Sequence, residues 1–166
     1  MDSLNHPAVT VALDALADAD RDLFPVSVLV REDLVAVVID GGRGRYIVFV
    51  HPDGDSWDTH GITFGASRPE GPREDRTSAH QPLQRYGTRF RSESADRDGV
   101  GWFAVIGRAA HDAESVRVVS TLEERVASIG ADGLAFAVVR ATGGEKPQVS
   151  VNTRDGRWVP AGPLVA

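Results

Sequence analysis

Short apolar runs separated by polar turns cover most of the chain. Valine occupies every second position from residue 26 to residue 30, and residues 34–39 and 46–50 are almost entirely apolar. A period of two is typical of a β-strand with one covered face, whereas a short continuous apolar run is typical of a strand covered on both faces. The pattern therefore predicts a mainly β protein.

Aspartate followed by glycine marks the ends of many of these runs. The dipeptide occurs five times, at Asp40-Gly41, Asp53-Gly54, Asp98-Gly99, Asp132-Gly133 and Asp155-Gly156. Asp-Gly suits the centre of a type I′ turn, where both residues need a positive φ, and such turns join antiparallel neighbours. We therefore expect hairpins at these positions. A turn centred on Asp53-Gly54 places Val50 opposite Trp57.

One helix is predicted, between residues 5 and 23. Asn5 can cap its first turn, and Pro7 lies near its start, where a missing N–H costs nothing. Aspartates crowd its far end, where the helix dipole disfavours negative charge. We expect the helix to end by about Asp20 and an extended segment to begin at Pro25.

The second half of the chain divides at a polar stretch. Residues 65–98 are rich in Arg, Glu, Asp, Ser and Pro, which predicts a charged loop or linker. Within it, the alternation of Tyr86, Thr88 and Phe90 with arginines suits a short strand. Residues 99–166 carry a second set of strand patterns with turn residues between them, as small β-sandwiches do.

Together these patterns predict a mainly β (α+β) fold. Residues 1–64 form one helix and an antiparallel β-meander, residues 65–98 a charged loop or linker, and residues 99–166 a β-sandwich block. The two blocks form either one domain or two. The second block resembles an immunoglobulin-type or carbohydrate-binding-type sandwich in its strand pattern, without the cysteine pair of true immunoglobulin domains.

The pattern over residues 5–64, a helix followed by a curved meander, resembles the opening of the NTF2-like (nuclear transport factor 2-like) cone fold. That resemblance implies a pocket between the curved sheet and its helices. In this chain the pocket would be lined by Leu16, Val28, Val37 and Phe49.

Composition narrows the classes of function. The chain has 166 residues, no cysteine and a net charge of −6, and Lys146 is its only lysine. An acidic balance disfavours general nucleic-acid binding, which needs cations against phosphates. No apolar stretch is long enough for a membrane span, and the N-terminus lacks the basic start of a signal peptide, so we expect a cytoplasmic protein. No cofactor is indicated.

The densest set of metal-ligand residue types lies between residues 51 and 60. In the register of the predicted hairpin, Asp58 lies opposite Phe49, and His51, Asp58 and His60 share one face of the two strands. Imidazoles and a carboxylate are ligands that divalent metals accept. These three residues are the candidate metal site, and with it comes the hypothesis of a metal-dependent hydrolase.

A second candidate site is a ligand or partner surface made of aromatic residues. Exposed aromatic rings are a common means of binding on β-sheet surfaces, since they combine a large apolar area with a polar edge. The candidates are Trp57, Tyr86, Arg89, Trp102 and Trp158.

No catalytic residues are assigned, because the chain has neither a Gly-x-Ser-x-Gly elbow nor a Walker-type loop. The first functional hypothesis is therefore a non-enzymatic protein-interaction or ligand-binding module, with a protein partner or a second copy of the chain as its partner. The NTF2-like pocket protein and the metal-dependent hydrolase are the alternatives.

Overall fold

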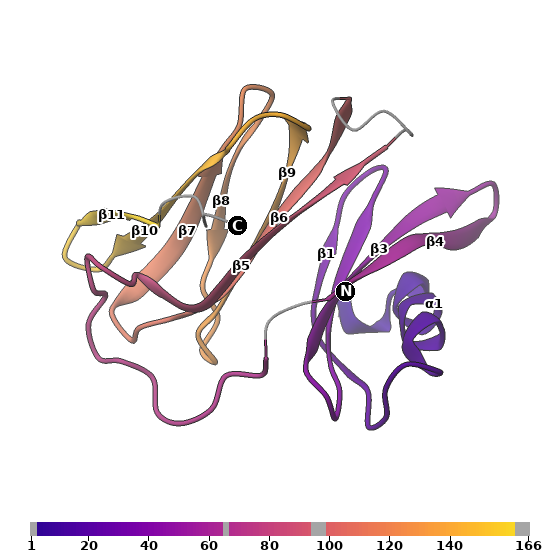
Figure 1. Cartoon of the computed structure of the whole chain (residues 1–166), viewed down its shortest axis with the longest axis horizontal. Helices are drawn as coiled ribbons and strands as arrows, with labels where there is room; N and C mark the ends of the chain where they lie inside the picture. Colours follow the sequence, from indigo (N-terminus) through magenta and orange to yellow (C-terminus); the bar gives the residue numbers. More distant parts are fainter. Residues whose placement is uncertain (1–2, 65–66, 94–98, 162–166) are drawn as a thin grey trace. The chain divides into compact units, whose positions relative to one another are not determined.

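The structure is a computed structural model that describes residues 3–64, 67–93 and 99–161, without the side chains of residue 3 and of residues 60–64. The chain divides into two compact units, Met1–Arg68 and Pro69–Ala166, and each is described by itself. Within the described residues, the two units contain one α-helix and three antiparallel sheets (Figure 1). The predicted mainly β fold is confirmed.

The first unit is a helix on a four-stranded meander. Its sheet has the strand order β1-β2-β3-β4, so every strand pairs with its neighbour in the chain, as the turn pattern predicts. The elements are η1 (Ser3–Asn5), α1 (Pro7–Leu16), β1 (Phe24–Val30), β2 (Val35–Asp40), β3 (Arg45–Asp53) and β4 (Ser56–Phe64).

The helix begins one residue later than predicted and ends earlier. His6 is the N-cap, and its ring Nδ1 accepts a hydrogen bond from the Ala8 N–H at 3.1 Å, while Asn5 belongs to the preceding 3-10 turn. The helix ends at Leu16, before the run of aspartates that its C-terminal dipole disfavours.

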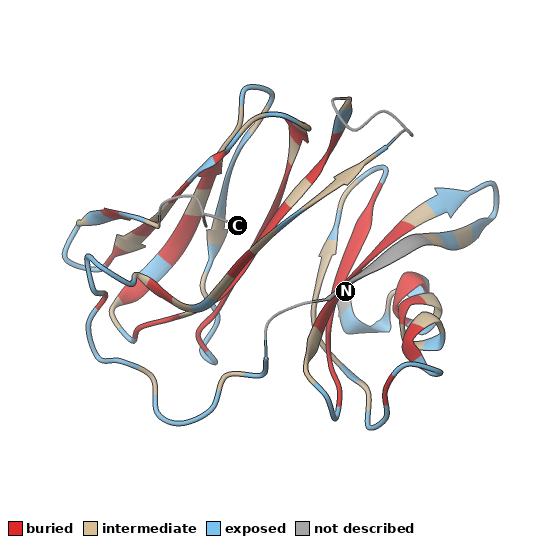
Figure 2. Cartoon of the chain, in the orientation of Figure 1, coloured by how far each residue is buried: buried red, intermediate tan, exposed pale blue. Residues whose placement is uncertain are grey.

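Alternate residues of the meander and one face of the helix make the core of the first unit. Val35, Val37 and Val48 pack against Leu16 on the face that α1 covers, and all four are fully buried. The continuous apolar run of β2 predicts a strand covered on both faces, and every residue of β2 is buried (Figure 2).

A buried carboxylate fixes the loops beside this core. Asp20 accepts hydrogen bonds from the Tyr46 hydroxyl at 2.6 Å and from the backbone N–H groups of Arg21 and Arg43 at 2.7 and 2.8 Å. The bond from Tyr46 keeps the pKa of Asp20 below its ordinary value, and the same bond raises the pKa of Tyr46. A Cβ on Gly41 would lie 2.6 Å from the Asp20 carboxylate, so the β2–β3 loop needs glycine there.

The second unit is a β-sandwich. One sheet has the strand order β11-β10-β7-β8 and the other β5-β6-β9. The strands are β5 (Leu83–Ser92), β6 (Val100–Ala109), β7 (Ala113–Val119), β8 (Glu124–Ser128), β9 (Leu134–Thr142), β10 (Gln148–Thr153) and β11 (Trp158–Pro160). The segment 65–98, for which the sequence predicts a loop or linker, contains β5, and β5 includes the alternating residues Tyr86, Thr88 and Phe90.

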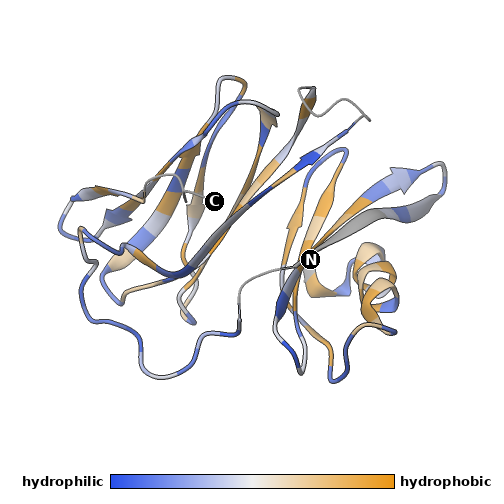
Figure 3. Cartoon of the chain, viewed as in Figure 1, coloured by the Kyte–Doolittle hydropathy of each residue, from blue (hydrophilic) through white to orange (hydrophobic). Residues whose placement is uncertain are grey.

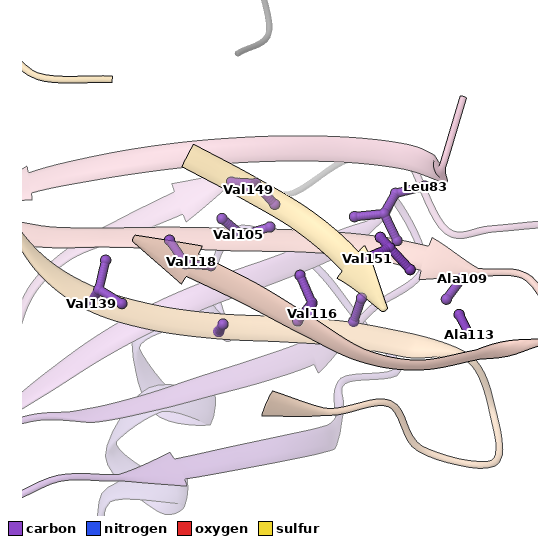
Figure 4. Packing of buried hydrophobic residues seen from close by; sticks show 11 residues of the cluster. Leu83, Val105, Ala109, Ala113, Val116, Val118, Val139, Val149 and Val151 are labelled. Atoms are coloured by element: carbon purple, nitrogen blue, oxygen red, sulfur yellow. The ribbon is translucent and has the colours of Figure 1, made fainter. Parts of the chain in front are cut away.

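The core of the sandwich lies between its two sheets. Val105 and Val139 come from one sheet, Val116, Val118 and Val151 from the other, and each is at most 1% exposed. Figure 4 shows these side chains between the strands. Since consecutive residues of a strand point to opposite faces, the residues between them on β7 and β10 face away from this core.

Part of the segment before β5 is a strap without regular structure, residues 69–82, that is hydrogen-bonded to the sandwich. The Arg73 guanidinium donates to the carbonyl oxygens of Ala109, Ala110 and Ala131 at 2.9, 3.0 and 2.9 Å. Ala109 and Ala110 lie where β6 ends and the connection to β7 begins, and Ala131 lies in the connection between β8 and β9. The charged composition that predicts a loop therefore also supplies its attachment (Figure 3).

A second attachment of the strap involves Asp112. One of its carboxylate oxygens accepts hydrogen bonds from the backbone N–H and the hydroxyl of Thr77 at 2.7 and 2.6 Å. The other accepts a charged hydrogen bond from Arg157 at 2.9 Å. The polar turn after β6 thus serves the fold of the second unit.

In three of the five Asp-Gly dipeptides the glycine has a positive φ and the aspartate does not, whereas Gly41 has no positive φ and Asp98 lies outside the described residues. Gly54, Gly133 and Gly156 have φ of 59°, 82° and 84°, and none of the preceding aspartates has a positive φ. These turns are therefore not of type I′, which needs positive φ at both residues. The turn at Gly133 also joins β8 to β9, which belong to different sheets, so it is no hairpin.

The register of the β3–β4 hairpin differs from the predicted one by two residues. Asp53 pairs with Ser56, so the loop consists of Gly54 and Asp55, and Val50 lies opposite Thr59 rather than Trp57. The predicted loop, Asp53-Gly54, begins one residue too early in the chain. In the structure Gly54 occupies the first of the two central positions of the turn, and not the second. From Val50 to Asp53 this shift of two leaves the side chains on their predicted faces. A β-bulge between Val48 and Val50 then places Ile62 opposite Val48, so beyond the bulge the shift is three and the predicted faces of β4 are wrong there.

Candidate functional site

The predicted metal residues are brought together only in part. His51 and Asp58 lie directly opposite each other on β3 and β4, so they share a face, whereas the side chain of His60 lies outside the described residues. The His51 ring lies 3.3 Å from the Asp33 carbonyl oxygen, and Asp58 accepts a hydrogen bond from the Thr59 N–H at 2.8 Å. The described residues contain no group of three or more metal-ligand side chains.

The predicted aromatic surface divides among different environments. Trp57, in the first unit, packs against the core there, with its ring 5.0 Å from that of His6. In the second unit Tyr86 packs against the sandwich core, and burial raises its pKa to about 12. Trp102 is buried within β6, 1% exposed, whereas Trp158 is 50% exposed.

The side chains of Arg89 and Tyr86 lie on opposite faces of β5. It pairs across the strands with Ala104, is exposed, and donates to the carbonyl oxygen of Thr88 at 2.7 Å. Trp158 lies in the other sheet of the sandwich. Within the second unit, the predicted aromatic residues therefore form no single surface, and Trp158 alone among its two tryptophans presents its ring to solvent.

The four-residue NTF2-like pocket does not form. Leu16, Val28 and Val37 pack in the core under α1, but Phe49 pairs with Ala36, on the opposite face of the sheet from Val37. Because side chains alternate along a strand, these four cannot line one common cavity.

The structure offers a different site, the outer face of the β11-β10-β7-β8 sheet. The strand registers align this face in rows that cross the sheet. One row consists of Val126, Arg117, Ser150 and Pro160, and the next of Ser128, Ser115, Asn152 and Trp158. Polar and apolar side chains are mixed on this face, unlike the inner face, which carries the valines of the core.

A groove of about 380 Å³ lies on this outer face. Its size is at the small end of the range for ligand sites. The sheet and the connection before β10 form it, and its lining residues are Arg117, Val119, Lys146, Pro147, Gln148, Val149, Ser150 and Pro160. We call it the Pro160 groove.

Arg117 connects the groove to the exposed tryptophan. Its guanidinium lies over the Trp158 ring, 5.7 Å from the centroid, and its Nε–H donates to the Glu124 carboxylate at 2.6 Å. The hydrogen bond to Glu124 raises the pKa of Arg117, and its counterpart lowers the pKa of Glu124. Both side chains are well exposed, so this ion pair contributes little to stability. It holds the guanidinium in place beside the groove.

The groove carries positive charge in an acidic protein. Arg117 and Lys146 are lining residues, and no carboxylate lines it. Lys146 is exposed and has no ion pair within the part of the chain that the structure describes. The neighbouring Glu145 is engaged by the hydroxyls of Thr121 and Thr142.

Sequence reasoning found Trp158 but not the residues beside it. Arg117, Ser150 and Pro160 come from three strands, and only the pairing of those strands places them in one row. The polar residues at alternate positions of β7 and β10 are a signal for an outward face, yet the sequence does not say which strands are neighbours.

No protein-family model, no curated protein and no solved structure matches this chain. None of the described helices is long and apolar enough to cross a membrane. The site is therefore interpreted from its own residues.

Proposed function

We propose that the second unit is a non-enzymatic binding module whose Pro160 groove holds an extended segment of a protein partner. The observation that carries this proposal is the groove itself, with the exposed Trp158 beside it and linked to it through Arg117. The core of the sandwich packs against the inner face of the same sheet.

The lining residues favour an extended peptide over other ligands. Two prolines and two valines provide an apolar floor, and a half-exposed indole stands at its side. Apolar grooves that present aromatic rings bind extended, proline-rich segments, which lose little conformational entropy when they bind. Gln148 and Ser150 add side chains that can hydrogen-bond to a peptide backbone.

The test is a selection from a random peptide library displayed on phage, carried out with the whole chain. Selected peptides are then titrated into the wild-type protein and into Trp158→Ala, with isothermal calorimetry for affinity and amide NMR shifts for position. We expect micromolar binding, shifts confined to β7, β10, β11 and residues 144–147, and at least tenfold weaker binding by Trp158→Ala, as is typical of an interface tryptophan.

Arg154→Ala is the matched control, since Arg154 is exposed in the β10–β11 turn and is not part of the groove. Its affinity should equal that of the wild type. Peptides that bind Trp158→Ala as tightly as the wild type, or that shift amides elsewhere, contradict the proposal.

A further inference from the structure

The Pro160 groove is lined by positive charges, whereas the chain as a whole is negatively charged. Its lining includes the only lysine of a chain with a net charge of −6, together with one arginine. Salt screens exposed charges beyond about 10 Å at ordinary ionic strength, so the charges that a bound ligand meets are the local ones. Locally the groove favours an anion.

Arg117 keeps hydrogen-bonding capacity despite its ion pair. A guanidinium has five N–H donors, and the bond to Glu124 uses the one at Nε. Within the described residues the terminal amino groups of Arg117 make no further hydrogen bond. Planar N–H pairs of this kind match the two oxygens of a carboxylate.

Lys146 supplies a second cation to the lining, from the connection before β10. It precedes Pro147, whose ring is buried and holds the chain at the start of β10. An ammonium is a compact charge with three donors on a flexible stem, so it can follow a ligand carboxylate that Arg117 orients. Both cations line the groove together with its two prolines and Ser150.

We propose that the groove selects a peptide segment in which an aspartate or glutamate side chain stands next to proline or aliphatic residues. The ligand carboxylate binds the terminal amino groups of Arg117 and the ammonium of Lys146, and the apolar neighbours lie on Pro147 and Pro160. This inference rests on the proposed function and names the chemistry of its ligand. An acidic polysaccharide would offer the carboxylates but not the apolar segment.

The test uses peptides from the selection, acetylated and amidated at their ends so that the side chains carry the only carboxylates. We expect the selected sequences to contain an acidic residue beside proline or an aliphatic residue. Its replacement by the neutral amide should weaken binding about tenfold, and Lys146→Gln should weaken it about fivefold, as expected for partly exposed charged contacts.

A double-mutant cycle separates a direct contact from a general charge effect. In Lys146→Gln, replacing the peptide's acid by its amide should cost less than it costs in the wild type. Glu124→Gln should tighten binding about twofold to threefold, because it removes a carboxylate that repels the ligand and competes for Arg117. Arg154→Gln removes an exposed cation outside the groove and should leave the affinity unchanged.

The two proposals fail in different ways. Neutral peptides that bind in the groove with no response to Lys146→Gln overturn the acidic ligand and leave the binding module standing. Acidic peptides that shift amides far from β10 and bind Trp158→Ala normally overturn the groove. Binding of a uronic-acid polysaccharide in the groove, with no peptide bound, overturns both the peptide and the protein partner.

Discussion

The two units place their polar side chains differently. In the first unit a carboxylate is buried, and Asp20 takes two backbone donors from loops and a hydroxyl donor from Tyr46 of β3. In the second unit the structural polar contacts lie at the ends of strands, where Arg73 and Asp112 attach the strap. The outer face of the four-stranded sheet is left with polar residues that the core does not need.

This difference distinguishes polar side chains that stabilise the fold from polar side chains that are available for binding. A buried hydrogen-bonded carboxylate is costly to remove, because its donors are left without a partner away from water. An exposed arginine over an exposed indole contributes little to folding. Arg117 and Trp158 are therefore better explained by binding than by stability, and this contrast can be tested in both units.

The largest effect is expected at the helix of the first unit. Leu16 is fully buried between α1 and the sheet, so Leu16→Ala leaves a cavity and should lower the free energy of unfolding by about 2–5 kcal/mol. Urea unfolding measures the loss, and peptide-resolved hydrogen exchange should place it in α1, β2 and β3. Leu122→Ala, at a 51% exposed position, should change stability by less than about 0.5 kcal/mol.

The second prediction compares two glycines with nearly equal φ. Gly133 and Gly156 have φ of 82° and 84°, so alanine at either costs roughly 1–2 kcal/mol. A Cβ on Gly133 would also lie 2.4 Å from Arg73 Nε, whereas nothing lies within 4 Å of a Cβ on Gly156. Gly133→Ala should therefore be more destabilising, by about 1–2 kcal/mol, because Arg73 must give up carbonyl contacts.

Arg73 itself provides the control for this comparison. In an Arg73→Ala background the clash is absent, so Gly133→Ala should then cost no more than Gly156→Ala does. Equal costs for the two glycine variants in the wild-type background would show that the strap contact does not constrain Gly133. Thermal unfolding followed by circular dichroism is sufficient to measure all four variants.

Much of the fold could be predicted from the sequence because its information is local. Continuous apolar runs identified β2 and β3, and alternation identified the strand in residues 83–92. The turn type could not be predicted, since Asp-Gly is compatible with several turns and glycine alone needs positive φ. The groove required the pairing of β7, β10 and β11, which is not encoded in any one segment.

The third prediction concerns pH and the first unit. The hydrogen bond from Tyr46 lowers the pKa of Asp20 below its ordinary value of 3.8, so the carboxylate stabilises the fold above that pH and loses this contribution as the pH falls through its lowered pKa. Tyr46→Phe removes one donor, which moves the pKa of Asp20 back up. The acid unfolding midpoint should therefore move to higher pH.

Tyr86→Phe is the control for the acid unfolding transition. Tyr86 is half-buried in the second unit, and its pKa is raised by burial and not by a hydrogen bond to a carboxylate. Circular dichroism at equilibrium from pH 6 to pH 2 measures both variants. If Tyr46→Phe and Tyr86→Phe have the same acid midpoint as the wild type, the Asp20 hydrogen bond is not what holds the loops at low pH.

The smallest effect on stability is expected where the effect on binding is largest. Trp158 is half-exposed on the short strand β11, and its described partner is the Arg117 guanidinium. Trp158→Ala should lower the free energy of unfolding by less than about 1 kcal/mol, the range of an exposed cation–π contact. A loss of 2 kcal/mol or more, measured by urea unfolding, would mean that the indole stabilises the sandwich. Weak peptide binding by the variant could then be due to unfolding, and Trp158→Phe would be needed to separate the two roles.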